Sequence, residues 1–177
     1  MIERAHTADL DPAALAEIRT LLNGAFDGQF AEEDWEHALG GTHLLLREDD
    51  ALIGHASVVQ RRLVHLGVGI RTGYVEAVAV RADRRRQGNG DALMAAAEEV
   101  VRRAYDLGAL SAAANARRLY ERRGWLAWIG ETGVLAPEGP RRTPEDDGGI
   151  LVLETPTSPE LVLRGALFCD WRPGDVW

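Results

Sequence analysis

One stretch of this sequence has the residue types and the spacing of an anion-binding turn. Arg85, Gly88 and Gly90 are spaced Arg-x-x-Gly-x-Gly, after an apolar segment that ends at Val80. A helix is predicted to begin near Asp91, so the turn joins a strand to a helix N-terminus. Backbone N–H groups point outward there, the helix dipole favours negative charge, and glycine lets a phosphate come close to the backbone. The turn therefore predicts a phosphate site, with an ordinary loop as the alternative interpretation of this motif alone.

The turn differs from two common phosphate-binding motifs. A P-loop closes with a lysine followed by serine or threonine, which this turn lacks. The dinucleotide-binding fingerprint needs three spaced glycines, and only two are present. Neither motif therefore accounts for the predicted site.

Two further side chains could transfer protons. Glu76 lies within the otherwise apolar segment 73–80, where a carboxylate is costly unless it is paired or faces a cleft. The alternatives are an edge position facing solvent or a structural pair with an arginine. Tyr120 has a phenol that can supply a proton at neutral pH. Its alternative is a packed tyrosine whose hydroxyl bonds to the backbone.

The elements that must position these residues follow from hydrophobic periodicity and from turn residues. Asp11 and Pro12 have the pattern of a helix N-cap followed by proline at the first helical position. Helices are predicted at 12–22, 32–39, 91–105 and 116–123. Strands are predicted at 42–47, 51–59, 61–66, 71–80, 107–111, 125–129, 150–154 and 161–170, with a long loop at 132–149. This order predicts an α/β (α+β) fold in one domain, 1–177, with a mixed central sheet and helices on both faces.

Composition narrows the classes of function. The chain has 177 residues, a hydrophobic fraction of 46% and a formal net charge of −8. We expect neither nucleic acid nor a membrane as partner, because both need a basic or strongly apolar surface. A cationic substrate would be attracted, although solubility alone would also explain the charge.

Cysteine and histidine usage gives further limits. Cys169 is the single cysteine, so it cannot form an intrachain disulfide or a thiolate zinc site, and we expect a small buried hydrophobe. No spacing among the histidines suggests a metal, and the N-terminus lacks the pattern of a secretory signal. A cytoplasmic protein without a metal cofactor is expected. The histidines are His6, His37, His43, His55 and His65.

The turn resembles the pyrophosphate loop of the GCN5-related N-acetyltransferases (GNAT). Two further segments are similar to that family and follow in the right order: 76–80, like the strand that holds the acetyl group and pantetheine, and 116–125, like a later helix with its Leu-Tyr pair. Ala82 departs from the family because a proline is common there. Ala113 departs because many relatives have asparagine, which leaves Asn115 or Ser111 as substitutes for one pantetheine contact.

The GNAT resemblance implies the fold, the cosubstrate and several roles. Acetyl-CoA would donate the acetyl group by direct transfer, with a backbone N–H near Val78 on the thioester carbonyl. Glu76 would act as base, directly or through water, and Tyr120 as the general acid for the leaving sulfur. The thioester is expected beside both side chains. The implied acetyl-CoA-binding residues are Val78, Ala79, Val80, Arg85, Arg86, Gln87, Gly88, Asn89 and Gly90.

The whole chain is similar to one branch of that family, the aminoglycoside 2'-N-acetyltransferases. The similar segments are 34–37, 73–83, 107–111, 116–120, 142–148 and 169–177. The resemblance implies a homodimer and a polycationic aminoglycoside held by acidic groups and by the C-terminal carboxylate, with Trp177 also at the catalytic centre. Gln29 stands where the branch has a substrate-binding aspartate, which implies lower affinity or another preferred substrate. The implied substrate-binding residues are Gln29, Asp34, Glu76, Ala77, Ser111, Glu145, Asp146, Asp175 and Trp177.

Two other functions remain open from the sequence. The chain could acetylate a different amine, such as a cell-wall sugar, a polyamine or a protein terminus. It could also be an acyl-CoA-binding sensor without turnover. Glu76 and Tyr120 together argue against the sensor, and the acidic loop and tail favour a cationic small molecule over a protein substrate.

Overall fold

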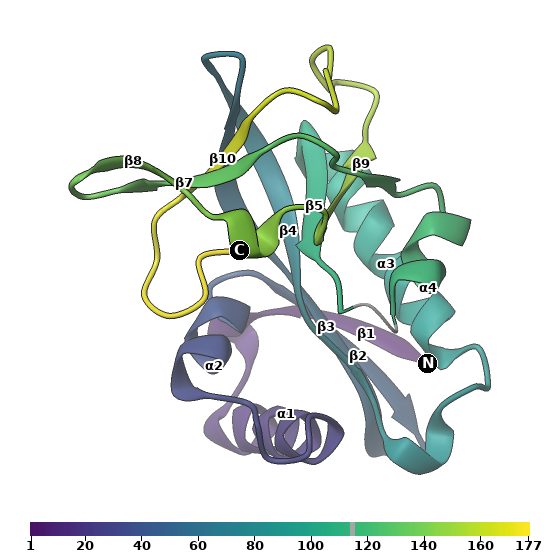
Figure 1. The fold of residues 1–177 in the computed structure, drawn as a ribbon. Helices are drawn as coiled ribbons and strands as arrows, with labels where there is room; N and C mark the ends of the chain where they lie inside the picture. The colour runs from purple at the N-terminus through teal and green to yellow at the C-terminus, as the bar shows by residue number, and fades with distance from the viewer. Residues whose placement is uncertain (114–115) are drawn as a thin grey trace. The chain divides into compact units, whose positions relative to one another are not determined.

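The computed structural model describes residues 1–113 and 116–177, and they form two compact units. The first unit comprises residues 1–59 and 75–100, and the second comprises 60–74 and 101–177. Three elements run through both units (Figure 1): β3 (Ala51–His65), β4 (Val68–Val80) and α3 (Asn89–Ala104).

The first unit contains one side of the sheet. β2 (Thr42–Glu48) pairs antiparallel with β1 (Ile2–His6) and with β3, and β3 neighbours β4. The register shifts at Leu46 and Arg47, where β3 contains a bulge. As a result Leu45 and Leu52 face the same side of the sheet, whereas without the bulge they would face opposite sides.

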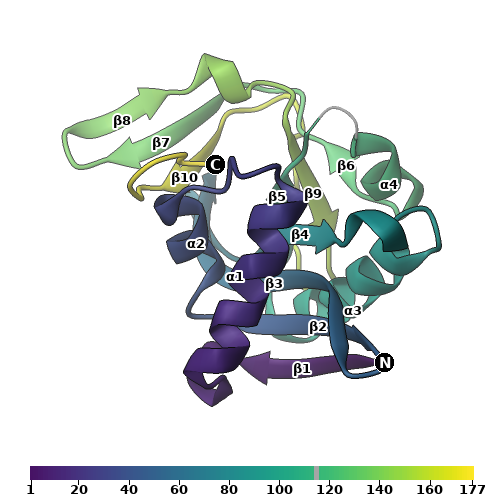
Figure 2. The ribbon, with the colours of Figure 1, turned by 90° about the horizontal axis from the view of Figure 1, so that it is seen from below.

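Two helices cover one face of this sheet. α1 (Pro12–Ala25) begins as predicted, with the Asp11 carboxylate accepting the Ala14 N–H at 2.8 Å. α2 (Glu32–Ala38) follows after a short connection, and Figure 2 shows α1 crossing β2 and β3. Their buried side chains form a core with the sheet, because each helix has its apolar residues on one side. That core comprises Ile18, Leu22, Trp35, Leu45, Leu52 and Ala79.

α3 covers the opposite face of the same unit. A Cβ on Gly54 would lie 2.9 Å from Leu93 Cδ1, so the helix can approach only because glycine stands there. Leu46 lies on the same side, since its side chain also borders Gly54. Arg4 of β1 forms an ion pair with Glu99 of α3. The prediction of helices on both faces is therefore confirmed.

The second unit contains the rest of the sheet. Its strand order is β6-β9-β5-β4-β3-β10-β7-β8. The pairs β4/β5 and β10/β7 are parallel, whereas β10/β3, β5/β9, β6/β9 and β7/β8 are antiparallel, which confirms the predicted mixed sheet. The remaining elements are β5 (Leu107–Ser111), α4 (Arg117–Arg122), β6 (Leu126–Ala127), β7 (Thr132–Ala136), β8 (Gly139–Arg142), β9 (Ile150–Glu154) and β10 (Leu167–Asp170).

The predicted loop at 132–149 is wrong. It contains the β7–β8 hairpin and a single 3₁₀ turn, Pro144–Asp146. Glycine and proline indicated a loop, but Gly139 (φ 122°) only starts β8 after the hairpin turn, and Pro140 lies on an edge strand, where its missing N–H costs little. Hydrogen bonds from Thr132 to Thr143 and Asp147 then hold the segment together.

Several strand bounds also differ from the prediction. Segments 51–59 and 61–66 are one strand, β3. Arg61 can remain in the sheet because its guanidinium forms an ion pair with Asp170 at 2.8 Å. The segments at 125–129 and 161–170 shorten to β6 and β10. Trp125 and Trp128 are both fully buried.

Candidate active site

The Arg-x-x-Gly-x-Gly turn leads directly into α3, as the sequence predicts. Arg86 (φ 58°) and Gly88 (φ 83°) both adopt the left-handed backbone conformation, and the Ala92 N–H donates to the Gly88 carbonyl at 3.0 Å to start the helix. The N–H groups of the first helical turn have no acceptor inside a helix. A Cβ at Gly88 would have no atom within 4 Å, so the space beside this backbone is open. The turn thus has the form of an anion site.

Polar side chains hold the turn in this shape. Arg85 donates to the Val80 carbonyl and to the Ala25 carbonyl, both at 3.0 Å. Asn89 donates to the Arg84 carbonyl at 2.8 Å. Arg85 therefore ties the turn to the end of α1, while Arg86 is exposed and presents its charge to solvent.

β4 contains a feature that the sequence does not indicate. Ala77 has φ 50°, although left-handed backbone is rare for a residue with a side chain. Such a residue interrupts the regular ladder and can turn a neighbouring N–H, such as that of Val78, out of it. The Ala77 carbonyl accepts from His55 Nδ1 at 2.9 Å, and Glu76 is half buried beside it. Because alanine is an ordinary strand residue, no sequence signal could have revealed this bulge.

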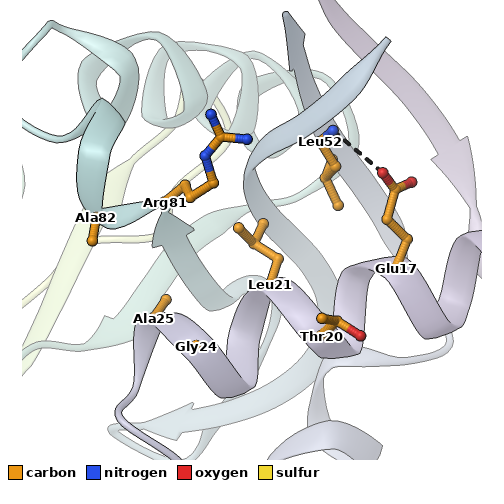
Figure 3. Close-up of a pocket in the computed structure, with 8 residues that line it drawn as sticks. All are labelled: Glu17, Thr20, Leu21, Gly24, Ala25, Leu52, Arg81 and Ala82. Carbon is orange, nitrogen blue, oxygen red and sulfur yellow. Dashed lines mark hydrogen bonds between the residues drawn. The ribbon is translucent and has the colours of Figure 1, made fainter.

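The first unit also contains a cavity of about 440 Å³ that none of the predicted site residues line. Figure 3 shows the residues of α1, β3 and the end of β4 that surround it, with the Glu17 carboxylate accepting the Leu52 N–H at 3.3 Å. The bond from Arg85 to Ala25 joins the wall of this cavity to the turn. The lining residues are Glu17, Thr20, Leu21, Gly24, Ala25, Leu52, Arg81 and Ala82.

Two predicted substrate residues lie near α2 in the first unit. Asp34 accepts the Ala31 N–H at 2.9 Å and so caps the helix that carries it. Gln29 is exposed in the connection between α1 and α2. The Asp34 carboxylate therefore has a structural role whatever else it binds.

Tyr120 lies on α4 in the second unit and is only 6% exposed. Its ring packs edge-on against Trp125, with 6.2 Å between the ring centroids. Burial raises the pKa of the Tyr120 phenol above its ordinary value of 10.0, so the group is protonated at neutral pH. A buried phenol in this state can donate a proton but cannot act as a base.

The second unit brings Trp177 to the acidic loop. The indole of Trp177 is 2% exposed and donates to Thr143 Oγ1 at 3.0 Å. Arg172 donates to the main-chain oxygens of Asp175 and Trp177, at 2.8 and 3.0 Å, which orders the tail. The last residues are thus built into the unit instead of fraying.

The acids of the loop divide into two kinds. Asp147 accepts the Thr132 N–H at 2.8 Å and an Arg142 N–H at 2.9 Å, and these bonds lower its pKa. Burial raises the pKa of Asp146, and the negative charges of Asp175, Glu145 and Asp147 raise it further. Asp147 is therefore structural, whereas Asp146 lies among other acidic groups that disfavour its charged form.

The other predicted residues of this unit are easily placed. Ser111 ends β5 opposite Ile150 and is exposed. Cys169 is buried, as predicted, and burial raises its pKa to about 11. Asn115, one of the two substitutes for the pantetheine contact, lies outside the described residues.

Comparison with known proteins addresses the family directly. A model of the Acetyltransferase (GNAT) family matches residues 14–125, more than half of the chain. The chain belongs to the GNAT acetyltransferase family. The predicted resemblance and the predicted enzyme class are thereby confirmed. The chain is also 53% identical, over 174 residues, to an aminoglycoside 2'-N-acetyltransferase of Mycolicibacterium fortuitum, which covers 97% of this chain and 89% of that protein.

Several solved structures share the fold at low sequence identity. Escherichia coli ElaA is 16% identical, with a TM-score of 0.62 and coverage of 87% of this chain and 99% of ElaA. A Brucella melitensis GNAT acetyltransferase, solved in complex with acetyl-CoA, is 17% identical, with a TM-score of 0.58 and coverage of 94% of both chains. Eis1 of Mycobacterium abscessus is 20% identical, with a TM-score of 0.61 and coverage of 75% of this chain, which spans 33% of Eis1.

Two features are absent from the described part of the chain. No helix there is long and apolar enough to cross a membrane. Among the same residues, no group of three or more histidine, cysteine, aspartate or glutamate side chains could hold a metal ion.

Proposed function

We propose that this enzyme transfers an acetyl group from acetyl-CoA to an amine of an aminoglycoside, the 2'-amine by analogy with its relative. The observation that carries the proposal is the 53% identity, along 97% of the chain, to a protein named aminoglycoside 2'-N-acetyltransferase. The alignment with that protein includes the acidic loop, which the GNAT family match does not cover.

The turn of the first unit fits the diphosphate of coenzyme A. The open space beside Gly88, the N–H groups of the first turn of α3 and the exposed Arg86 would hold it. The N–H of Val78 would bind the thioester carbonyl, and Ala79 and Val80 would contact the pantetheine. When bound, acetyl-CoA supplies the activated acetyl group.

Proton transfers are assigned to one residue of each unit. The amine nitrogen forms a bond to the carbonyl carbon, the carbon–sulfur bond breaks, and the Val78 N–H stabilises the developing negative oxygen. Glu76 accepts the proton that the nitrogen loses, directly or through water. Tyr120, whose phenol is protonated at neutral pH, gives its proton to the departing sulfur.

Substrate binding is assigned mainly to acids. Aminoglycosides have several ammonium groups, which form charge-assisted hydrogen bonds to carboxylates. Asp146 and Asp175 support this role, because their negative charges repel each other and a cation between them would relieve that repulsion. Trp177 would contact the substrate through its main-chain oxygens. Gln29, Asp34, Ala77, Ser111 and Glu145 complete the proposed set.

Coenzyme A release tests this function. Kanamycin B has an amine at the 2' position and kanamycin A has a hydroxyl there, so they form a matched pair. We expect turnover of kanamycin B and tobramycin, and little with kanamycin A, spermidine or a panel of peptides. Glu76→Gln should slow release about 100-fold, as loss of a general base does. Turnover of the peptides alone, or of both kanamycins equally, would contradict the proposal.

A further inference from the structure

Two buried histidines of the first unit form one hydrogen-bonded chain. His43 lies on β2 and His55 on β3, and both side chains are fully buried. His43 Nδ1 and His55 Nε2 are 2.9 Å apart, with 5.2 Å between the ring centroids. Buried polar groups of this kind are kept only where each finds a partner.

The two ends of the chain are also bonded. At one end Thr7 Oγ1 lies 2.8 Å from His43 Nε2 and accepts the Gly40 N–H at 2.9 Å. At the other end His55 Nδ1 lies 2.9 Å from the carbonyl oxygen of Ala77, the residue with left-handed backbone in β4. The chain therefore connects the loop before β2 to the bulge beside Glu76.

The position of each proton follows from the acceptor at the end. A carbonyl oxygen can only accept, so His55 must have its proton on Nδ1, and its Nε2 must accept from His43 Nδ1. His43 Nε2 is then left to accept the Thr7 hydroxyl proton. Burial lowers the pKa of His43 to about 4 and that of His55 to about 3, so both rings are neutral near pH 7.

This arrangement holds the backbone and cannot deliver protons to a substrate. A relay needs a terminal group that can take up a proton and pass it on, and a main-chain carbonyl does neither at neutral pH. What the bond does instead is stabilise one orientation of the Ala77 peptide, in a conformation that residues with side chains disfavour.

We propose that His55, oriented by His43, is a positioning residue that holds the Ala77 bulge so that the Val78 N–H is set for the thioester carbonyl. This inference rests on the proposed function for the role of Val78. It assigns no contact with substrate to either histidine.

The test compares the Kd of acetyl-CoA with that of coenzyme A, which lacks the acetyl carbonyl, by calorimetry on the full chain. The wild type should bind acetyl-CoA more tightly, and His55→Leu should bring the ratio of the two Kd values to about one while coenzyme A still binds. His55→Asn places an amide N–H near the position of Nδ1 and should restore the wild-type ratio. Turnover should follow the same order, with kcat about tenfold lower in His55→Leu, as expected when one buried hydrogen bond is lost.

His65 provides a matched control. It is buried in the second unit, and its Nδ1 bonds the Ala166 carbonyl at 2.9 Å, so His65→Leu removes the same kind of bond elsewhere. This variant should keep the wild-type ratio. A folded His55→Leu with the wild-type ratio, an equal loss in His65→Leu, or a wild type without preference would overturn the inference. Because the two Kd values are measured without an aminoglycoside, absence of aminoglycoside turnover would count against the proposed function alone.

NMR of ¹⁵N-histidine-labelled wild type tests the inference without any substitution. We expect His43 and His55 both neutral at pH 7, each with its proton on Nδ1. A His55 signal that shows the proton on Nε2 would mean that the bond to Ala77 is absent, and this too would overturn the inference.

Discussion

Tyr120 combines a packed ring with a protonated hydroxyl. The phenol lies against Trp125, and burial raises its pKa further above the neutral range. An ordinary phenol is already protonated at neutral pH, so burial does not create the acid form and makes the proton harder to release. The proposed acid role therefore depends on the position of the hydroxyl beside the departing sulfur.

Replacing Tyr120 by phenylalanine should separate turnover from binding. The ring still packs, so the fold and the Kd of acetyl-CoA should remain, whereas kcat should fall roughly 100-fold because the sulfur loses its proton donor. Steady-state kinetics and calorimetry on the same preparation measure both quantities. An unchanged kcat would rule out the acid role.

At Trp177 the important contact is the indole N–H. Trp177→Phe keeps most of the buried ring but removes the donor to Thr143 Oγ1. We expect a loss of stability of about 1 kcal/mol, the usual net value of a buried hydrogen bond, and a higher KM for the aminoglycoside. Thr143→Val removes the same bond from the other side and also the bond from Thr143 Oγ1 to Thr132 Oγ1, so urea unfolding should give a larger loss for this variant. A wild-type KM in both would show that the tail does not line the substrate site.

Among the elements, the turn before α3 depends most on backbone geometry. Its shape depends on the left-handed Arg86 and Gly88, and Arg85 fixes the turn to the end of α1 through the Ala25 carbonyl. The element can therefore offer an anion site before any ligand arrives, with little ordering left to occur on binding.

Gly88→Ala tests this element, with Gly67→Ala as its control. Both glycines have left-handed φ, 83° and 77°, and a Cβ would have no atom within 4 Å at either position. Each change should therefore cost about 1 kcal/mol of stability through backbone strain. Only Gly88→Ala should also raise the Kd of acetyl-CoA, by roughly tenfold for a similar energy. Equal Kd values in the two variants would argue against the turn as the diphosphate site.

For the molecule as a whole, acid sensitivity should reflect the two buried histidines. Unfolded histidine titrates near pH 6.5, whereas burial lowers the pKa of His43 to about 4 and that of His55 to about 3. Between these limits the unfolded chain binds more protons than the folded chain. The free energy of unfolding must therefore fall as the pH falls below 6.5. Well above that value both histidines are neutral in the folded and the unfolded chain, so they no longer reduce the stability.

Urea unfolding at a series of pH values checks this. We expect a loss on the order of 3 kcal/mol between pH 6.5 and 4.5, with His55→Asn showing a shallower slope because one group no longer titrates. Carboxylates with lowered pKa, such as Glu17, act only below their ordinary value of 4.5 and so occupy a separate range. A stability that stays constant from pH 6.5 to 5 would contradict neutral burial of the histidines.

The sequence by itself determined what depends on neighbours along the chain. The Asp11 cap, the periodic apolar face of α1, the Arg-x-x-Gly-x-Gly turn and the apolar strand around Glu76 are local patterns, and the structure has all of them. The order of these patterns along the chain is what resembles the GNAT family. Local signals are sufficient there because capping, helix periodicity and glycine conformation are set within a few residues.

Only the tertiary structure decided the features that join distant residues. The sequence predicted a loop where β7 and β8 form a hairpin, which a hydrogen bond from Thr132 to Asp147 helps to hold together. Arg61 remains within β3 because Asp170 pairs with it from another strand. The Ala77 bulge and the chain from His43 through His55 had no signal at all. Each depends on a partner far along the chain, and spacing within one sequence carries no information about which distant groups will meet.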